Sequence, residues 1–99
     1  MKVRYEVIAE TEPAEAERYR DYMQTRHLPD IWATGCFAMI VFSQTAPNTF
    51  RAAYIAETQA DLDRYLNEHT AHFRADFSQH FPQGVSVSRA VWTDVGVWE

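Results

Sequence analysis

Two of the four histidines, His27 and His69, stand where an imidazole could transfer protons. Each lies in a run of apolar residues at helical spacing, and each is therefore expected to point at a sheet beneath its helix. Imidazole titrates near neutral pH, which suits it to general acid–base catalysis. If both helices cover one sheet face, the two rings could meet in one cavity. The apolar neighbours are Ala16, Tyr19 and Met23 for His27, and Leu62, Tyr65, Leu66, Phe73 and Phe77 for His69.

The stretch RHLPDIWATGCF, residues 26 to 37, adds polar and aromatic side chains beside the first of these histidines. Asp30 is a candidate to orient an imidazole, Trp32 to form an aromatic wall, and Thr34 to bond a ligand. Each has a structural alternative: Asp30 as a helix-turn cap or solvated carboxylate, Trp32 as a packing residue and Thr34 as a turn-capping hydroxyl. The histidines too have one, as core residues bonded to backbone carbonyls. Gly35 is expected to supply a positive φ at the entry to a strand.

Two further residues complete the predicted ligand-binding set. Tyr54 is a hydrogen-bonding partner for a buried imidazole. Arg89 follows the inward pattern of the last strand, and a guanidinium on an apolar face needs a carboxylate from the protein or from a ligand. The other arginine in this part of the chain, Arg74, is expected on the solvated flank of its helix.

The residues give no pattern for a metal or cofactor. His69 and His72 are three residues apart on a helix, but no Cys or Glu completes a known ligand spacing. The three glycines form no phosphate-binding loop, and a chain this short leaves little room for haem. Cys36 is expected to be a small buried apolar residue. We therefore expect no metal and no cofactor.

The elements that would position these residues follow from periodicity. Residues 3–9 alternate as a strand, residues 11–28 form an amphipathic helix ended by Pro29, and residues 36–44 and 50–58 form a hairpin. Residues 59–81 predict one long helix or two consecutive pieces, and residues 85–95 a fourth strand. The order predicts an α+β, ferredoxin-like βαββαβ fold, with both helices on one face of a four-stranded antiparallel sheet.

Composition limits the function classes. The 99 residues are expected to form a single domain, 1–99, and the net charge of -5 argues against nucleic-acid binding. The N-terminus alternates like a strand rather than a signal peptide, and no run is apolar enough for a membrane helix. With one cysteine, no intramolecular disulfide is possible, which fits a reducing, cytoplasmic setting.

The strand at residues 36–44 is apolar on both faces, although helices would cover only one. A second copy of the chain is the economical cover for the other face, so we expect a homodimer.

Three segments carry a resemblance to a known family: HLPDIWATGCF, AAYIAET and LDRYLNEHTAHFR. Over nearly its whole length the chain resembles the small bacterial family called domain of unknown function 4286, which belongs to the dimeric α+β barrel superfamily. That resemblance implies the ferredoxin-like fold and a dimeric barrel. The superfamily also includes cofactor-independent monooxygenases, muconolactone isomerases and haem-dependent chlorite dismutases, so the resemblance implies no single activity.

Two functions remain open. The first is a small cofactor-free enzyme acting on a hydrophobic or carbonyl-containing metabolite by proton transfer through His27 or His69. The second is a non-catalytic ligand-binding or protein-interaction domain that uses the same pocket. An open, polar-lined cavity beside the histidines favours the enzyme, and a filled core favours the second function or a purely structural role.

Overall fold

The computed structural model describes all residues, 1–99, and shows a four-stranded antiparallel sheet with helices on one face. The strands are β1 (Val3–Thr11), β2 (Met39–Ala46), β3 (Thr49–Ala56) and β4 (Val85–Thr93), in the order β2-β3-β1-β4. The predicted ferredoxin-like fold is confirmed. Strand ends differ from the predicted ones by a few residues, as expected where side-chain patterns fade at turns. None of the helices combines the length and apolarity that crossing a membrane requires.

The first helical segment is longer than predicted. It comprises a 3-10 turn η1 (Pro13–Glu15), α1 (Ala16–Tyr22), a π-helical turn η2 (Met23–His27) and α2 (Leu28–Trp32). The prediction that Pro29 ends the helix is therefore wrong. In a regular α-helix the proline ring would clash with the carbonyl four residues earlier, but the wider π turn precedes Pro29 here. The Leu28 N–H reaches back five residues to the Met23 carbonyl.

The second helical segment is two pieces, α3 (Gln59–Glu68) and α4 (Thr70–His80). Thr58 caps the first piece, since its hydroxyl oxygen accepts the Asp61 N–H at 3.2 Å. His69 stands between the pieces with φ −123° and ψ −29°, outside helical geometry. The break turns α4 relative to α3, so positions before and after His69 do not share one continuous stripe.

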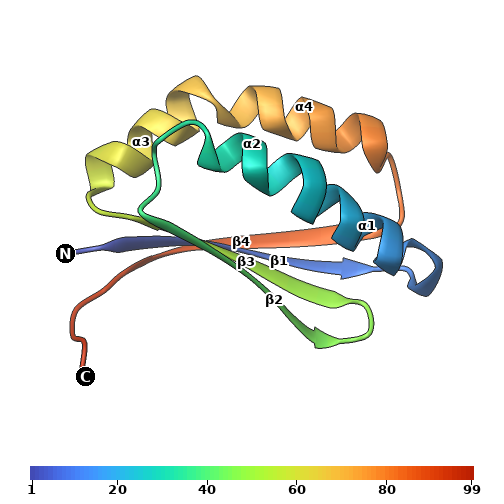
Figure 1. Cartoon of the computed structure of the whole chain (residues 1–99), viewed down its shortest axis with the longest axis horizontal. Coiled ribbons are helices and arrows are strands. Elements are labelled where there is room, and N and C mark those ends of the chain that lie inside the picture. Colours follow the sequence, from blue (N-terminus) through green and yellow to red (C-terminus); the bar gives the residue numbers. More distant parts are fainter.

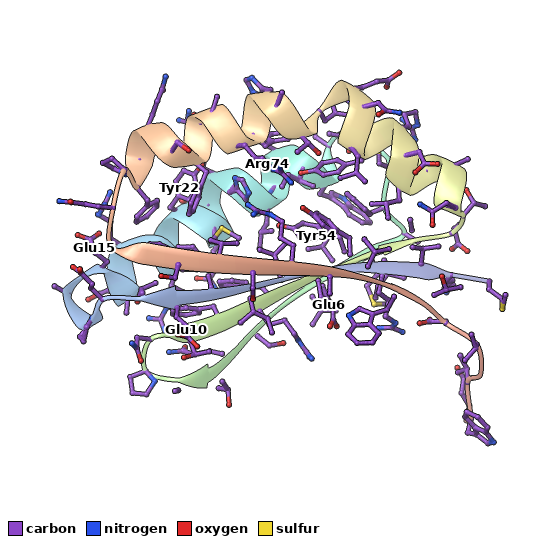
Figure 2. The ribbon with its side chains drawn as sticks, turned by 180° about the vertical axis from the view of Figure 1, so that it is seen from behind. Glu6, Glu10, Glu15, Tyr22, Tyr54 and Arg74 are labelled. Carbon is purple, nitrogen blue, oxygen red and sulfur yellow. The ribbon has the colours of Figure 1, made fainter.

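An aromatic core lies between helices and sheet. On β3, Phe50, Ala52 and Tyr54 alternate toward the helices and are buried. Figure 2 shows Tyr54 on the helix side of the sheet and Glu6 on the other. The helices contribute three further buried side chains to this core: Tyr19, Tyr65 and Phe73.

The opposite face of the sheet carries no helix (Figure 1). Met39 and Val41 of β2 lie on this face, 52% and 39% exposed, and Trp92 of β4 is 57% exposed. At the edge of the helical layer, Gly35 has φ +74°, as the sequence predicts, and it turns the chain from α2 toward β2.

Candidate functional site

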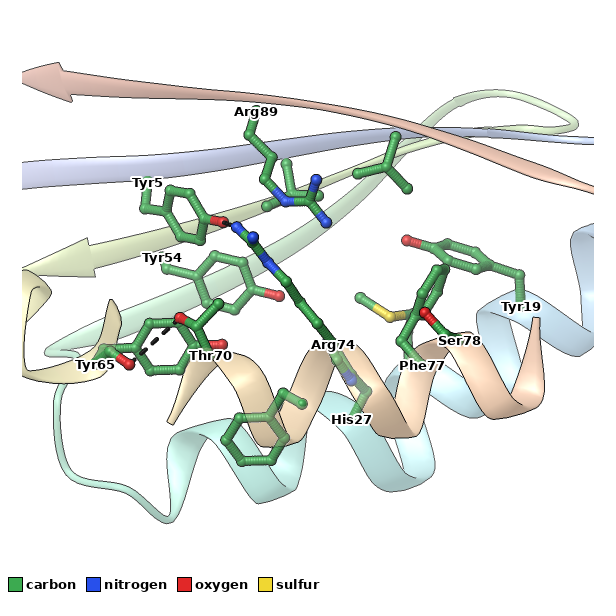
Figure 3. Close-up of a pocket in the computed structure, with 14 residues that line it drawn as sticks. Tyr5, Tyr19, His27, Tyr54, Tyr65, Thr70, Arg74, Phe77, Ser78 and Arg89 are labelled. Atoms are coloured by element: carbon green, nitrogen blue, oxygen red, sulfur yellow. Dashed lines mark hydrogen bonds between the residues drawn. The ribbon is translucent and has the colours of Figure 1, made fainter. Parts of the chain in front are cut away.

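A cavity of about 210 Å³ lies between α4 and the sheet (Figure 3). Fourteen residues line it, nine of them hydrophobic, and none is an aspartate or glutamate. Strands β1, β3 and β4 contribute its floor, and α4 with η2 its roof. A small, mostly apolar hollow with a few polar groups is the usual form of a small-molecule site.

His27 enters this cavity from the π turn, on the inward side that its helical spacing predicts. In a regular helix of 3.6 residues per turn, positions four apart drift steadily around the axis. A π turn takes up the extra residue, and here it keeps Met23, His27 and Ile31 on the sheet side. Met23 is 2% exposed and Ile31 is 1% exposed. His27, at the last position of the turn, lines the cavity.

The hydrogen bond between His27 and Tyr22 determines which ring nitrogen of His27 carries the proton. Tyr22 donates its hydroxyl proton to Asp76 Oδ2 at 2.7 Å, and the same hydroxyl lies 3.3 Å from His27 Nδ1. A phenol has one proton, so toward His27 the Tyr22 oxygen must accept. His27 Nδ1 then carries the imidazole proton. Nε2 is left with a free lone pair and no hydrogen-bond partner in the protein.

The imidazole is neutral at physiological pH. Burial lowers the pKa of His27 from 6.5 to about 4, against the smaller opposing influence of the Asp76 and Asp30 charges. Phe73 and Phe77 surround the ring, with centroids 6.0 and 6.1 Å from it. This apolar enclosure disfavours the imidazolium unless a negative charge enters the cavity.

Asp76 anchors the network from α4. Its carboxylate accepts two hydrogen bonds from Arg26, from Nε at 3.0 Å and from Nη2 at 2.6 Å. These bonds, and next that from Tyr22, hold the pKa of Asp76 below its ordinary value of 3.8. Burial, and next the bond to Asp76, raises the pKa of the Tyr22 phenol. The phenol therefore stays protonated and keeps its donor role.

Two guanidinium groups stand at the cavity. Arg74 of α4 and Arg89 of β4 both line it, and Arg74 Nη2 is 3.5 Å from the Tyr5 hydroxyl. Arg89 lies on the inward face of β4, as the sequence predicts, and forms no ion pair within the chain. Arg74, expected on the solvated flank of α4, is exposed but extends over the cavity.

Of the residues predicted for the site, the structure brings His27, Tyr54 and Arg89 together in one cavity. Tyr54 is buried, and its ring lies 5.7 Å from that of Tyr5.

His69 lies outside this cavity, so the expectation that both imidazoles share it is not met. The cause is the helix break: His69 sits at the junction of α3 and α4, where extrapolation along one stripe fails. Its ring stacks near Tyr65, with centroids 6.2 Å apart, and Nε2 is 3.9 Å from Glu68 Oε2.

Asp30, Trp32 and Thr34 also lie away from the cavity. Asp30 is exposed in the first turn of α2 and holds no imidazole by a hydrogen bond. Trp32 is 52% exposed and borders a shallow groove beside β2. Thr34 caps its turn: the hydroxyl donates to the Ile31 carbonyl at 2.7 Å and accepts the Cys36 N–H at 3.3 Å.

The sequence did contain a signal for two residues that it did not single out. Asp76 lies three residues after Phe73 and four before His80, and Tyr22 lies three residues after Tyr19. A carboxylate on an otherwise aromatic stripe needs a partner. Which phenol or guanidinium supplies it depends on how the two helical segments cross.

No three His, Cys, Asp or Glu side chains are grouped so as to hold a metal ion. Cys36 is a free cysteine, 2% exposed, in keeping with the expected apolar role.

The sheet order, the helices on one face and the cavity between them define a ferredoxin-like α+β protein with a small-molecule-sized hollow. The chain belongs to the family described as Domain of unknown function (DUF4286), whose model matches residues 2–95. A search of curated proteins finds no match.

Solved structures with the same fold share little sequence with the chain. A dimeric ferredoxin-like protein from an uncultured marine organism is 11% identical, with a TM-score of 0.78 over 98% of each chain. SnoaB, a cofactor-independent oxygenase from Streptomyces nogalater, is 12% identical, with a TM-score of 0.72 over 97% of this chain and 95% of that one. The NE2512 protein of unknown function from Nitrosomonas europaea is 16% identical, with a TM-score of 0.68 over 99% and 95%. At these identities the likeness shows the fold alone.

Proposed function

We propose that the protein is a cofactor-free enzyme that moves a proton on a small hydrophobic, carbonyl-containing metabolite, with His27 as the proton acceptor. The observation that carries the proposal is a neutral imidazole in an aromatic cavity, with Nδ1 bonded to Tyr22 and Nε2 free. SnoaB, described as a cofactor-independent oxygenase, has the same fold, which supports the cofactor-free part of the proposal.

The step can be written with its proton and electrons. His27 Nε2 takes a proton from a carbon next to the carbonyl, and the C–H electron pair moves to the carbonyl oxygen, giving an enolate and an imidazolium. The Tyr22 oxygen accepts from Nδ1–H of the imidazolium, and the Asp76 carboxylate behind it offsets the new positive charge. The enolate itself raises the pKa of His27, since an anion now faces the ring.

Exchange of substrate hydrogen for solvent deuterium tests this step without knowledge of the natural substrate. Phenylpyruvate in D2O, a ring with a carbonyl and an acidic CH2, is expected to gain deuterium faster with the protein than without it. His27→Gln should abolish the acceleration, while His72→Gln, at an exposed position of α4, should retain it. Equal acceleration by the His27 variant would overturn the role of His27.

The low pKa of His27 favours a second candidate, a non-catalytic binding protein, because an imidazole with a pKa of about 4 is a weak base. In this case the cavity would bind carbonyl compounds while solvent exchange stayed at the uncatalysed rate. His69, Asp30, Trp32 and Thr34 have no part in either proposal, since they lie outside the cavity.

We propose further that the protein is a homodimer joined through the uncovered sheet face. The exposed apolar side chains of Met39, Val41 and Trp92 lie on this face, and Ile8 of β1 adds a fourth, 41% exposed. Arg4, Glu6 and Arg51 stand among them on the same face. Exposed apolar surface bordered by polar residues is typical of protein–protein contact sites. Two solved structures described as dimeric ferredoxin-like proteins share the fold, which supports a dimer here.

A further inference from the structure

We propose that the cavity selects small, flat, apolar molecules that carry a carboxylate, and that Arg74 and Arg89 bind this carboxylate. The proposal rests on the same cavity as the proposed enzyme, and names its ligand class, but it does not require the proton transfer at His27.

The first support is that both arginines at the cavity lack an acidic partner. The ion pairs of the chain neutralise most of its arginines, each with an aspartate or glutamate: Arg4, Arg18, Arg26, Arg51 and Arg64. Arg20, Arg74 and Arg89 have no such partner, and all three are exposed. Only Arg74 and Arg89 line the cavity, where no acidic residue stands. The chain as a whole carries a net charge of -5, whereas the charged residues that line this cavity are both arginines. Both guanidinium groups are therefore free to bind a carboxylate that a ligand brings into the cavity.

The second support is where the two charges point. In Figure 3 both guanidinium groups lie at the same side of the cavity, near the Tyr5 hydroxyl to which Arg74 extends. Burial raises the pKa values of Tyr19, Tyr54 and Tyr65, and the positive charge of Arg89 opposes this rise at each of them. The positive charge of Arg89 therefore influences groups that line the cavity. Two like charges at one site repel, and a bound carboxylate removes this repulsion while accepting charge-assisted hydrogen bonds.

The third support is the shape of the apolar part. The rings of Tyr65 and Phe73 are nearly parallel, at 11° with centroids 6.2 Å apart, and Tyr54 lies at 20° to Tyr65. Walls of this kind suit the face or edge of a flat ring. Cavities for drug-sized ligands measure roughly 300–1,000 Å³. With about 210 Å³, this one suits a ligand of one or two rings.

Binding of trans-cinnamate, compared with cinnamyl alcohol, tests the proposal. The two molecules share ring and chain and differ in the carboxylate. Calorimetry at constant ionic strength is expected to give at least about tenfold tighter binding of cinnamate. Equal affinity for the two molecules, or no binding of cinnamate at millimolar concentration, would overturn the proposal.

Arginine variants locate the effect. Arg74→Gln and Arg89→Gln are each expected to weaken cinnamate binding about tenfold or more and to leave cinnamyl alcohol unaffected. Arg20→Gln removes an exposed arginine of α1 that has no ion pair, so it changes net charge equally and should leave both affinities unchanged. If Arg20→Gln weakened cinnamate binding as much, the effect would come from the overall charge of the protein, and the proposed carboxylate site would be wrong.

Two controls distinguish a loss of carboxylate binding from unfolding of the variant and from a loss of proton transfer. Arg89→Lys keeps the charge and the long stem but loses the planar fork, so it should bind cinnamate with an affinity between wild type and Arg89→Gln. Thermal melts identify any variant whose loss comes from unfolding. Cinnamate has no acidic C–H, so its binding can be measured independently of proton transfer, including when phenylpyruvate shows no exchange. Conversely, exchange without carboxylate preference would leave the proposed enzyme in place and remove only this inference.

Discussion

Tyr22 donates a 2.7 Å hydrogen bond to Asp76, and this bond ties the first helical segment to α4 across 54 residues of sequence. The same hydroxyl fixes the His27 tautomer, because its only proton is already given to Asp76. One phenol thus links the packing of two helices to the state of the imidazole in the cavity.

Tyr22→Phe is expected to cost roughly 1–3 kcal/mol of unfolding free energy, since His27 Nδ1–H and Asp76 both lose a partner in a largely enclosed place. Urea unfolding of the two proteins measures the difference. Tyr65→Phe is the matched control, because the Tyr65 hydroxyl makes no hydrogen bond within the chain. An equal loss in both variants would show that the Tyr22 hydroxyl has no special role.

The pH dependence of stability follows from the lowered pKa of His27. Between pH 6.5 and about 4, the unfolded chain binds a proton at His27 that the folded chain does not. Stability should therefore be fully present above about pH 6.5 and fall as the pH drops, by about 3 kcal/mol in all from this residue. The lowered pKa of Asp76 acts in the same direction at still lower pH.

Comparison with His27→Gln isolates this contribution. Unfolding free energies of both proteins are measured at several pH values across that window. The variant should lose less stability on acidification than wild type, because it has no imidazole to protonate. Parallel curves for the two proteins would mean that His27 titrates alike in folded and unfolded chains.

The dimer makes a separate prediction. Sedimentation of the wild type at micromolar concentration should give about twice 11.5 kDa. Val41→Glu places a charge in the uncovered sheet face and should give the monomer mass, whereas Gln79→Glu adds the same charge on exposed α4 and should not. A monomeric wild type would remove the proposed interface.

The sequence predicts those features of the structure that depend on local patterns of apolar residues. Alternation on Val3, Tyr5 and Val7 and helical spacing on Tyr19 and Met23 are local, and they identified the elements and their order. Strand alternation placed Arg89 at the cavity. Tyr54, predicted as a partner for a buried imidazole, also lines the cavity, but the hydroxyl beside His27 is that of Tyr22. Period-two alternation is robust, because one face of the sheet must be buried.

The errors arose where a helix departs from 3.6 residues per turn. The π turn before Pro29 extended the first helical segment, and the break at His69 removed that histidine from the stripe. Neither departure leaves a simple mark in composition. The bond from Tyr22 to Asp76 joins residues 54 apart, and it depends on the crossing of two helices, which no local pattern specifies.

The most direct test of the account is the nitrogen NMR spectrum of the histidine rings, recorded from about pH 4 to about pH 8. One of the four rings, missing in His27→Gln, should stay neutral down to about pH 4 with its proton on Nδ1. Its Nε2 signal should shift when trans-cinnamate is added, because the ligand carboxylate brings a negative charge into the same cavity. A His27 ring that titrates near 6.5 and is unmoved by saturating cinnamate would contradict the account.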